Sequence, residues 1–152
     1  MERVTEAVVI RPLAAGDREA WLPLWRGYLE FYRATIADDG TALTWQRLLD
    51  PSEPMTAFGA FDDRGLFGIA HAILHRSTWT AGDYCYLQDL FVAPDRRGTG
   101  AGAALIEAVC EFAKREGASR VHWLTHETNE TARRLYDKVA ERSGFIQYRR
   151  ML

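Results

Sequence analysis

The chain has 152 residues and a mass of 17.3 kDa, which is the size of one ordinary domain. Hydrophobic residues make up 47% and charged residues 26% of it, and this composition excludes a disordered, collagen-like or disulfide-stapled chain. The net charge of -2 supplies no field that would attract nucleic acid or an anionic membrane. We therefore expect a soluble domain spanning residues 1–152, with no nucleic-acid and no membrane partner.

Alternating strand and helix patterns predict a mixed α/β (α+β) domain with an antiparallel meander first and β-α-β-α-β after it. Aromatic side chains at helical spacing, from Trp21 to Tyr32, mark the first helix. In chain order we expect a strand at 7–11, a helix capped by Asp17 and broken at 38–40, a shorter helix to residue 49, strands at 56–61 and 66–74, a strand at 84–92, a helix ending at Gly117, a strand at 121–124, a helix at 129–139 and a closing strand at 145–150.

The cysteines and the N-terminus both indicate the cytoplasm. Cys85 and Cys110 are too few for a disulfide framework at this length, so we expect buried free thiols in a reducing compartment. Residues 1–6 contain acids and no long apolar core, which is unlike a signal peptide. We therefore expect a cytoplasmic protein.

A glycine-rich turn is the most informative segment of the chain. Gly98, Gly100 and Gly102 leave backbone N–H groups uncovered at the start of a helix, where the helix dipole also favours an anion. Arg96 and Arg97 precede the turn, where a phosphate ligand needs neutralising charge. The turn therefore predicts a phosphate-binding site.

The spacing of the turn narrows the kind of phosphate ligand. A P-loop requires Lys followed by Ser or Thr after the last glycine, and Ala103 and Ala104 stand there instead. Gly98, Gly100 and Ala103 fit the relaxed dinucleotide fingerprint, but residues 93–97 separate this turn from the preceding strand. A dinucleotide-binding domain is therefore a minor alternative.

Two blocks in the second half of the chain have the order and spacing of a known family. They are Arg97-x-x-Gly100-x-Gly102, after a strand that ends Asp89-Leu90-Phe91-Val92-x-Pro94, and Asn129-x-x-Ala132-x-x-Leu135-Tyr136 on the next helix, followed by Ser143-Gly144-Phe145. They resemble the acetyl-CoA motif and the later motif of the GNAT superfamily of N-acetyltransferases. The tracts at 25–32 and 123–129 look most like the branch that includes histone, polyamine and thialysine acetyltransferases.

The resemblance implies a central mixed, mostly antiparallel sheet, flanked by helices and splayed between the strands at 84–92 and 120–125. Acetyl-CoA would lie in the wedge as cosubstrate, with its pantetheine amides on the backbone of Leu90 and Val92 and its pyrophosphate on the amides of 97–102. The implied contacts are Leu90, Phe91, Val92, Arg97, Gly98, Thr99, Gly100, Ala101, Gly102, Asn129, Arg133 and Tyr136. The resemblance also implies a homodimer, formed through the closing strand near 145–150.

The same resemblance implies catalytic roles and leaves the general base open. Tyr136 would donate a proton to the departing thiolate, and the backbone N–H of Leu90 would stabilise the developing oxyanion. Gln88 stands where the polyamine branch has a glutamate, and an amide cannot accept a proton at neutral pH. Asp89, the following residue, is another candidate base. Successive strand residues face opposite sides, however, so Asp89 need not face the substrate and can equally bond nearby backbone. The other candidates are Glu30, His71, His75, His126, Glu127 and a chain of water molecules.

Charge distribution favours a cationic acceptor. Residues 28–65 hold seven acids and three arginines, whereas residues 89–150 hold nine acids and eleven bases. Because the acidic part includes the helices that line the acceptor side of the GNAT fold, we expect a polyamine, a lysine side chain or another small cationic amine; ordinary loop acids would explain the same counts. The substrate candidates are Trp25, Tyr28, Glu30 and Tyr32, within a tract that is otherwise mostly core.

No metal site is expected. The histidine pairs at 71/75 and 122/126 have ligand spacing only on a helix, and both fall in predicted strands or at their ends. The leading hypothesis is an acetyl-CoA-dependent N-acetyltransferase that transfers acetyl directly to a primary amine in a ternary complex. The alternative, favoured by Gln88 in place of an acid, is a catalytically weak acyl-CoA-binding or sensing module.

Overall fold

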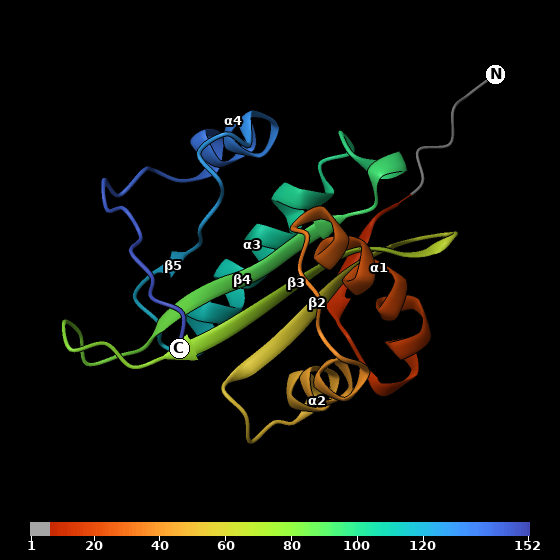
Figure 1. The fold of residues 1–152 in the computed structure, drawn as a ribbon, viewed down its shortest axis with the longest axis horizontal. Helices are drawn as coiled ribbons and strands as arrows, with labels where there is room; N and C mark the ends of the chain where they lie inside the picture. The colour runs from red at the N-terminus through yellow and green to blue at the C-terminus, as the bar shows by residue number, and fades with distance from the viewer. Residues whose placement is uncertain (1–6) are drawn as a thin grey trace.

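A five-stranded sheet forms the centre of the structure, a computed structural model that describes residues 7–152 (Figure 1). Residues 1–6, whose composition is unlike a signal peptide, lie outside the described residues. The elements are β1 (Val9–Pro12), the 3-10 turn η1 (Ala15–Asp17), α1 (Arg18–Phe31), α2 (Asp38–Leu49), β2 (Met55–Asp62), β3 (Gly65–His75), β4 (Tyr84–Val92), the 3-10 turn η2 (Pro94–Arg96), α3 (Ala101–Arg115), β5 (Val121–His122) and α4 (Glu130–Val139). The strands lie in the order β1-β2-β3-β4-β5. Neighbours are antiparallel except β4 and β5, which are parallel. This confirms the mixed, mostly antiparallel sheet.

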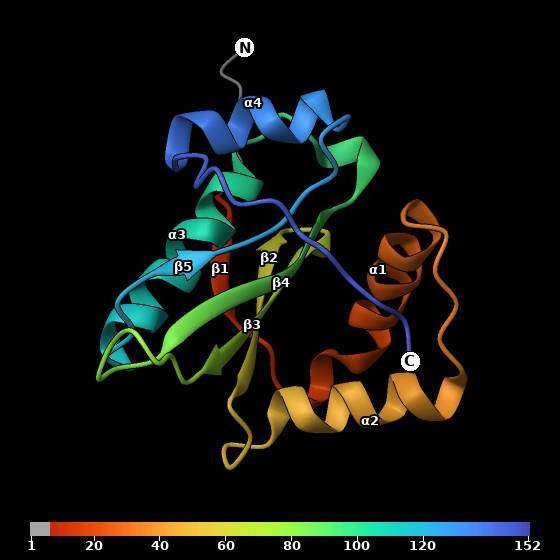
Figure 2. The same cartoon turned by 60° about the vertical axis from the view of Figure 1, so that its left-hand side comes forward.

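Helices cover both faces of the sheet (Figure 2). α3 buries Leu105 and Val109 against one face, and α1 and α2 bury Trp21 and Trp45 against the other, with Ile69 of β3. Each large apolar side chain buried in this way contributes roughly 1.5–3 kcal/mol. Two separate cores therefore hold the sheet, and the strands between them position the groups described below.

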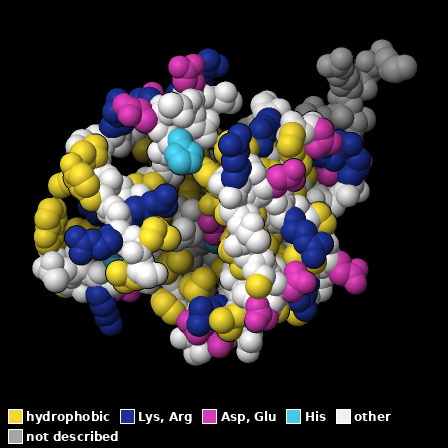
Figure 3. All heavy atoms as spheres, viewed as in Figure 1, with side chains coloured by type: hydrophobic (Ala, Val, Ile, Leu, Met, Phe, Trp, Pro, Cys, Tyr) yellow, Lys and Arg dark blue, Asp and Glu magenta, His cyan; other side chains and the backbone are white. Residues whose placement is uncertain are grey.

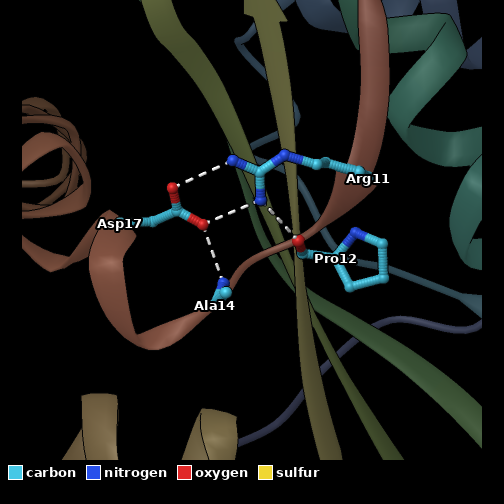
Figure 4. Close-up of polar contacts among 4 residues, drawn as sticks. All are labelled: Arg11, Pro12, Ala14 and Asp17. Atoms are coloured by element: carbon cyan, nitrogen blue, oxygen red, sulfur yellow. Dashed lines mark hydrogen bonds and ion pairs between the residues drawn. The ribbon is translucent and has the colours of Figure 1, made fainter.

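An ion pair ties β1 to α1 (Figure 4). Asp17 is the N-cap residue of α1, as predicted, but its side chain makes no capping bond to that helix. Its carboxylate instead accepts two hydrogen bonds from the Arg11 guanidinium, at 2.8 and 3.0 Å, and one from the backbone N–H of Ala14 at 2.7 Å. The hydrogen bond with Arg11 is the main reason that the pKa of Asp17 is lowered.

Two predicted elements differ from the structure. Residues 38–40 do not end a helix; they form the first turn of α2, where Asp38 and Asp39 meet the positive end of the helix dipole. The closing strand at 145–150 is absent, and residues 140–152 are irregular and exposed. Because β5 pairs over only two residues, the chain offers this segment no long strand edge of its own.

Candidate active site

β4 and β5 separate after a short contact. Their register pairs Cys85 with Val121 and Tyr86 with His122, and no further pairs follow within the described residues. The Val92 carbonyl points into the resulting wedge, where it accepts a hydrogen bond from Arg97 Nε at 3.2 Å. Because alternate residues of a strand offer their backbone groups to the same side, Leu90 presents its N–H to the wedge as well. The predicted splay of the sheet is therefore present.

A cavity of about 650 Å³ opens into this wedge. Figure 3 shows the corresponding face hollowed near its centre, with hydrophobic side chains gathered around the hollow. The cavity brings together predicted residues from three elements, namely Trp25, Tyr28, Tyr32, Gln88, Asp89, Leu90 and Tyr136. It also contains groups for which the sequence assigned no substrate contact, among them Thr125 after β5 and Arg149 in the C-terminal segment. Arg149 adds a cation to the wall of the cavity.

A bulge at Gln88 turns Asp89 into the cavity. Ala72 of β3 is level with Leu87, and His71 is level with Asp89, so Gln88 is an extra residue on β4. Leu87 packs into the core beneath α3, whereas Asp89 lies beside His71 on the opposite face. The expectation that strand alternation separates Gln88 from Asp89 is therefore wrong here, since both line the cavity.

Asp89 is a buried carboxylate that is bonded to a side chain and not to the backbone. It is 8% exposed and bonds His71 Nδ1 through Oδ2 at 2.9 Å. His71 is 2% exposed, and its Nε2 bonds the indole Nε1 of Trp21 at 3.0 Å. Among the described residues, no Lys or Arg forms an ion pair with Asp89. The cavity wall therefore holds an acid that is bonded to a histidine and to no Lys or Arg of the described residues.

Three tyrosines surround this carboxylate. Burial, followed by the negative charge of Asp89, raises the pKa of Tyr28, Tyr32 and Tyr86. Their phenols therefore stay protonated at neutral pH. Tyr28 stacks on Trp25 with ring centroids 5.6 Å apart, so aromatic faces and an anion share one region of the cavity. This combination suits a cation, which both the carboxylate and the ring faces attract.

Tyr136 reaches the cavity from α4. Its ring meets Trp123 edge to face at 5.4 Å, and burial raises its pKa to about 12, with a smaller contribution from Tyr32. The phenol is therefore protonated at neutral pH and keeps a proton to donate. The structure places Tyr136 and Leu90 in one cavity with Asp89, as a transfer reaction requires of a proton donor and an oxyanion donor.

The glycine-rich turn has the geometry of an anion cradle. Gly98 and Gly100 have φ angles of 82° and 83°, a left-handed conformation that glycine adopts without strain. Gly100 is the N-cap of α3, and the first backbone bond to its carbonyl comes from Ala104. The amides of 101–103 therefore have no partner within the helix and face out at its positive end.

The two arginines before the turn have different roles. Arg96 forms an ion pair with Asp62 at the end of β2, and their side chains are only 12% and 4% exposed. Its guanidinium also lies over the ring of Phe67. The expectation that Arg96 neutralises a phosphate is therefore wrong, because its charge is already paired within the fold. Arg97 is exposed and lies beside the rings of Phe31 and Phe91.

Three other predicted residues, Glu30, Asn129 and Arg133, lie outside the main cavity. Glu30 lines a smaller hollow of about 380 Å³ that also contains Phe91 and Arg97. Asn129 caps α4 by accepting a hydrogen bond from the Ala132 N–H at 3.3 Å. Arg133 donates to the Glu127 carbonyl at 2.7 Å. The last two side chains thus order the start of the helix that carries Tyr136.

The sequence indicated His71 only as one of several possible bases and Trp21 only as one of the aromatic residues of the first helix. The missing signal is the contact between them, which joins residues 50 apart in the chain. In residues 7–152, no group of three or more His, Cys, Asp or Glu side chains is arranged to hold a metal ion. No helix in that range combines the length and apolar character needed to cross a membrane.

Comparisons with known proteins agree with this geometry. Residues 20–140 match the family described as Acetyltransferase (GNAT) family. The D-amino-acid N-acetyltransferase HPA3 of Saccharomyces cerevisiae is 32% identical over 149 residues, covering 97% of this chain and 92% of that protein. The thialysine N-epsilon-acetyltransferase of Mus musculus is 35% identical over 78 residues, covering 48% and 45%. The crystal structure of the aminoglycoside N-acetyltransferase AAC(6')-Iy with CoA shares the fold, with a TM-score of 0.85 at 19% identity over 99% of both chains.

Proposed function

The chain belongs to the GNAT acetyltransferase family of acetyl-CoA-dependent N-acyltransferases, and we propose that it acetylates a small cationic amine in a ternary complex. One observation carries this proposal: Asp89, the Leu90 backbone and Tyr136 line a single cavity in the wedge between β4 and β5. The cavity thus combines a carboxylate that can bind and deprotonate the amine, a hydrogen-bond donor for an oxyanion and a proton donor for a leaving thiolate. These are the groups that acetyl transfer to an amine needs.

The residues present fit acetyl-CoA. The unpartnered amides at the start of α3, in particular 101–103, would hold the pyrophosphate. The open edge of β4 at Leu90 and Val92 would hold the pantetheine amides. When bound, acetyl-CoA supplies the activated acetyl group as a thioester. We propose that the other contacts of the predicted set, namely Phe91, Arg97, Thr99, Asn129 and Arg133, act by shaping these two surfaces.

Three groups of the cavity each have one role in the reaction. Asp89 attracts the ammonium form of the acceptor and takes its proton, which leaves a neutral nitrogen to form the new C–N bond. The Leu90 N–H donates to the oxygen on which negative charge develops. Tyr136 donates its proton to the sulfur as the C–S bond breaks, and the second proton, which the nitrogen loses on becoming an amide, returns to the tyrosine through solvent. Burial raises the pKa of Tyr136 to about 12, which keeps its proton in place before the transfer, and the same burial would make a leaving thiolate more basic.

The anionic, aromatic wall supports the choice of acceptor. Asp89 with Trp25, Tyr28 and Tyr32 forms a surface that favours a primary ammonium group, such as that of a polyamine or a lysine side chain. The names of two relatives add D-amino acids and thialysine to the acceptors worth testing. Gln88 is placed to hold the acceptor or a water molecule by hydrogen bonds.

A panel assay tests the proposal. CoA release from acetyl-CoA is followed with polyamines, lysine peptides, D-amino acids, thialysine and aminoglycosides as acceptors. Release above the acceptor-free rate supports catalysis. Thermal stabilisation by acetyl-CoA without release for any amine would favour the binding or sensing module. Thermal stabilisation by NAD instead of CoA would favour a dinucleotide-binding domain.

Tyr136→Phe tests the general acid. The substitution keeps the ring against Trp123 and removes only the hydroxyl. We expect kcat to fall by about 10²–10⁴-fold, the usual contribution of a general acid, while acetyl-CoA still raises the melting temperature as in the wild type. An unchanged kcat would remove Tyr136 from the mechanism.

We also propose a homodimer that covers the C-terminal segment. Ile146 is 75% and Tyr148 is 88% exposed in a segment with no sheet partner, while Gln147 and Arg149 between and after them line the cavity. A second copy would bury the exposed apolar side chains and pair the free backbone. Size measurement by light scattering should give a dimer, and Ile146→Asp with Tyr148→Asp should give a monomer. A wild-type monomer at micromolar concentration would contradict this proposal.

A further inference from the structure

The hydrogen bonds around His71 determine where its proton lies. The indole N–H of Trp21 is only a donor, so the nitrogen it meets, Nε2 of His71, must be the acceptor. A neutral imidazole with an accepting Nε2 carries its proton on Nδ1. Nδ1–H then donates to Asp89 Oδ2 at 2.9 Å. The three side chains form one directed chain of hydrogen bonds from α1 through β3 to β4.

This direction has a consequence for charge. A histidine next to a buried carboxylate usually gains a second proton, and the resulting imidazolium neutralises the acid. Here a second proton on Nε2 would point at the indole N–H, and two donors would face each other in a site where Trp21 is fully buried. Trp21 therefore opposes protonation of His71. Asp89 then receives a hydrogen bond from a neutral group and no compensating positive charge.

We propose that Trp21 and His71 are positioning residues that keep Asp89 oriented and electrically uncompensated, so that it can bind the ammonium group of the acceptor. The catalytic part of this inference rests on the proposed function. The direction of the hydrogen bonds does not depend on that function. Trp21 does not line the cavity; it contacts the cavity wall through its hydrogen bond to His71 and by stacking on Trp25. His71 itself forms part of the cavity wall beneath Asp89.

The other titratable groups facing this site do not confuse a pH experiment. They are Tyr28, Tyr32, Tyr86, His126, Tyr136 and Arg149. Burial raises the pKa of all four tyrosines, so these stay protonated between pH 5 and 8, and an arginine stays charged throughout. His126 is the other imidazole at the cavity, and because it is present in every variant below, its contribution cancels in the ratio of variant to wild type.

Nitrogen-15 NMR of the full chain tests the proton position without any substrate. With four histidines in the chain, the signals of His71 are identified by their loss in His71→Asn. We expect Nδ1 protonated and Nε2 unprotonated from pH 5 to 8 in the wild type. In Trp21→Phe, His71 should take up a second proton as the pH falls through this range. A doubly protonated His71 in the wild type at pH 6, or a proton on Nε2, would overturn the proposal.

Kinetics test the effect on the acceptor. For Trp21→Phe, kcat/KM for the best amine of the panel, relative to wild type, should fall about tenfold between pH 8 and pH 6, or about 1.4 kcal/mol, with the KM for acetyl-CoA unchanged. Trp45→Phe is the matched control, because Trp45 packs on Trp21 at 4.8 Å but has no bond to His71. Its ratio to wild type should not depend on pH.

The double variant Trp21→Phe/His71→Asn separates the charge effect from packing. The Asn amide N–H occupies the place of His Nδ1–H, so it can donate to Asp89, but it takes up no proton. The tenfold pH dependence should therefore disappear in the double variant even though Trp21 is still absent. If the double variant keeps that dependence, Trp21 acts only by packing. If the wild type acetylates no amine, the proposed function fails, and the NMR titration still decides the inference.

Discussion

Replacing Asp89 with Asn is the sharpest single perturbation of the site. The side chains have nearly the same shape, and the Asn oxygen can still accept the His71 N–H that lies 2.9 Å away. The negative charge is lost, and with it the capacity to take a proton from the amine. A unit charge pair 4 Å apart is worth roughly 4 kcal/mol at the effective dielectric of a partly buried site. Desolvation of both partners leaves roughly 1.5–3 kcal/mol for a charged hydrogen bond. From the lost charge alone we therefore expect kcat/KM for a cationic amine to fall roughly 10- to 150-fold, and loss of the proton acceptor should lower kcat further.

The assay is the initial rate of CoA release at pH 7.5, with the amine varied at saturating acetyl-CoA. Acetyl-CoA should raise the melting temperature of Asp89→Asn as much as that of the wild type. The reason is that Asp89 lies beside His71 in the cavity and not in the turn at Gly98–Gly100. Gln88→Ala provides a neighbouring control that leaves the charge in place and should lower kcat/KM less. A wild-type kcat/KM for Asp89→Asn would refute the assignment of the amine site to this carboxylate.

Three further predictions follow from the cradle, the β1–α1 ion pair and the Arg96 ion pair. Gly100 has a φ of 83°, and no atom lies near the position of an added Cβ. Gly100→Ala should therefore lower the free energy of unfolding in urea by roughly 1–2 kcal/mol and weaken the thermal stabilisation by acetyl-CoA. Gly16→Ala is the control, because Gly16 is equally unhindered but has an ordinary φ, and it should cause neither effect. Asp17 has a lowered pKa when folded, so its contribution is present above pH about 4 and is lost as the pH falls further. Asp17→Asn should therefore cost about 1 kcal/mol or less at pH 7, since its arginine partner is 42% exposed, and the difference should shrink as the pH falls below about 4. Asp62→Asn leaves the buried Arg96 with only the exposed Asp95, 4.0 Å away, as an ionic partner and should cost roughly 3–5 kcal/mol, measured by urea unfolding; a loss under 1 kcal/mol would contradict the pairing.

Local patterns in the sequence predicted most of the fold and the residues proposed to hold the cosubstrate. The glycines at 98, 100 and 102 identify their turn because a left-handed backbone and uncovered amides are properties of a few adjacent residues. Tyr136 was found by its position in a motif, and the cavity contains it. The closing strand at 145–150 was wrongly predicted for the same reason, since its alternating side chains favour a strand but a strand requires a neighbour.

What the sequence by itself determined is the family, the order of the elements and the segments that bear the chemistry, because motif spacing and side-chain periodicity act over short stretches of chain. Only the tertiary structure decided which groups meet. The bulge that brings Asp89 into the cavity depends on the register between β3 and β4, and the hydrogen bond from Trp21 to His71 depends on how α1 packs against β3. Such contacts arise when distant elements bury their apolar faces together, and no local pattern encodes which buried polar atoms will then pair.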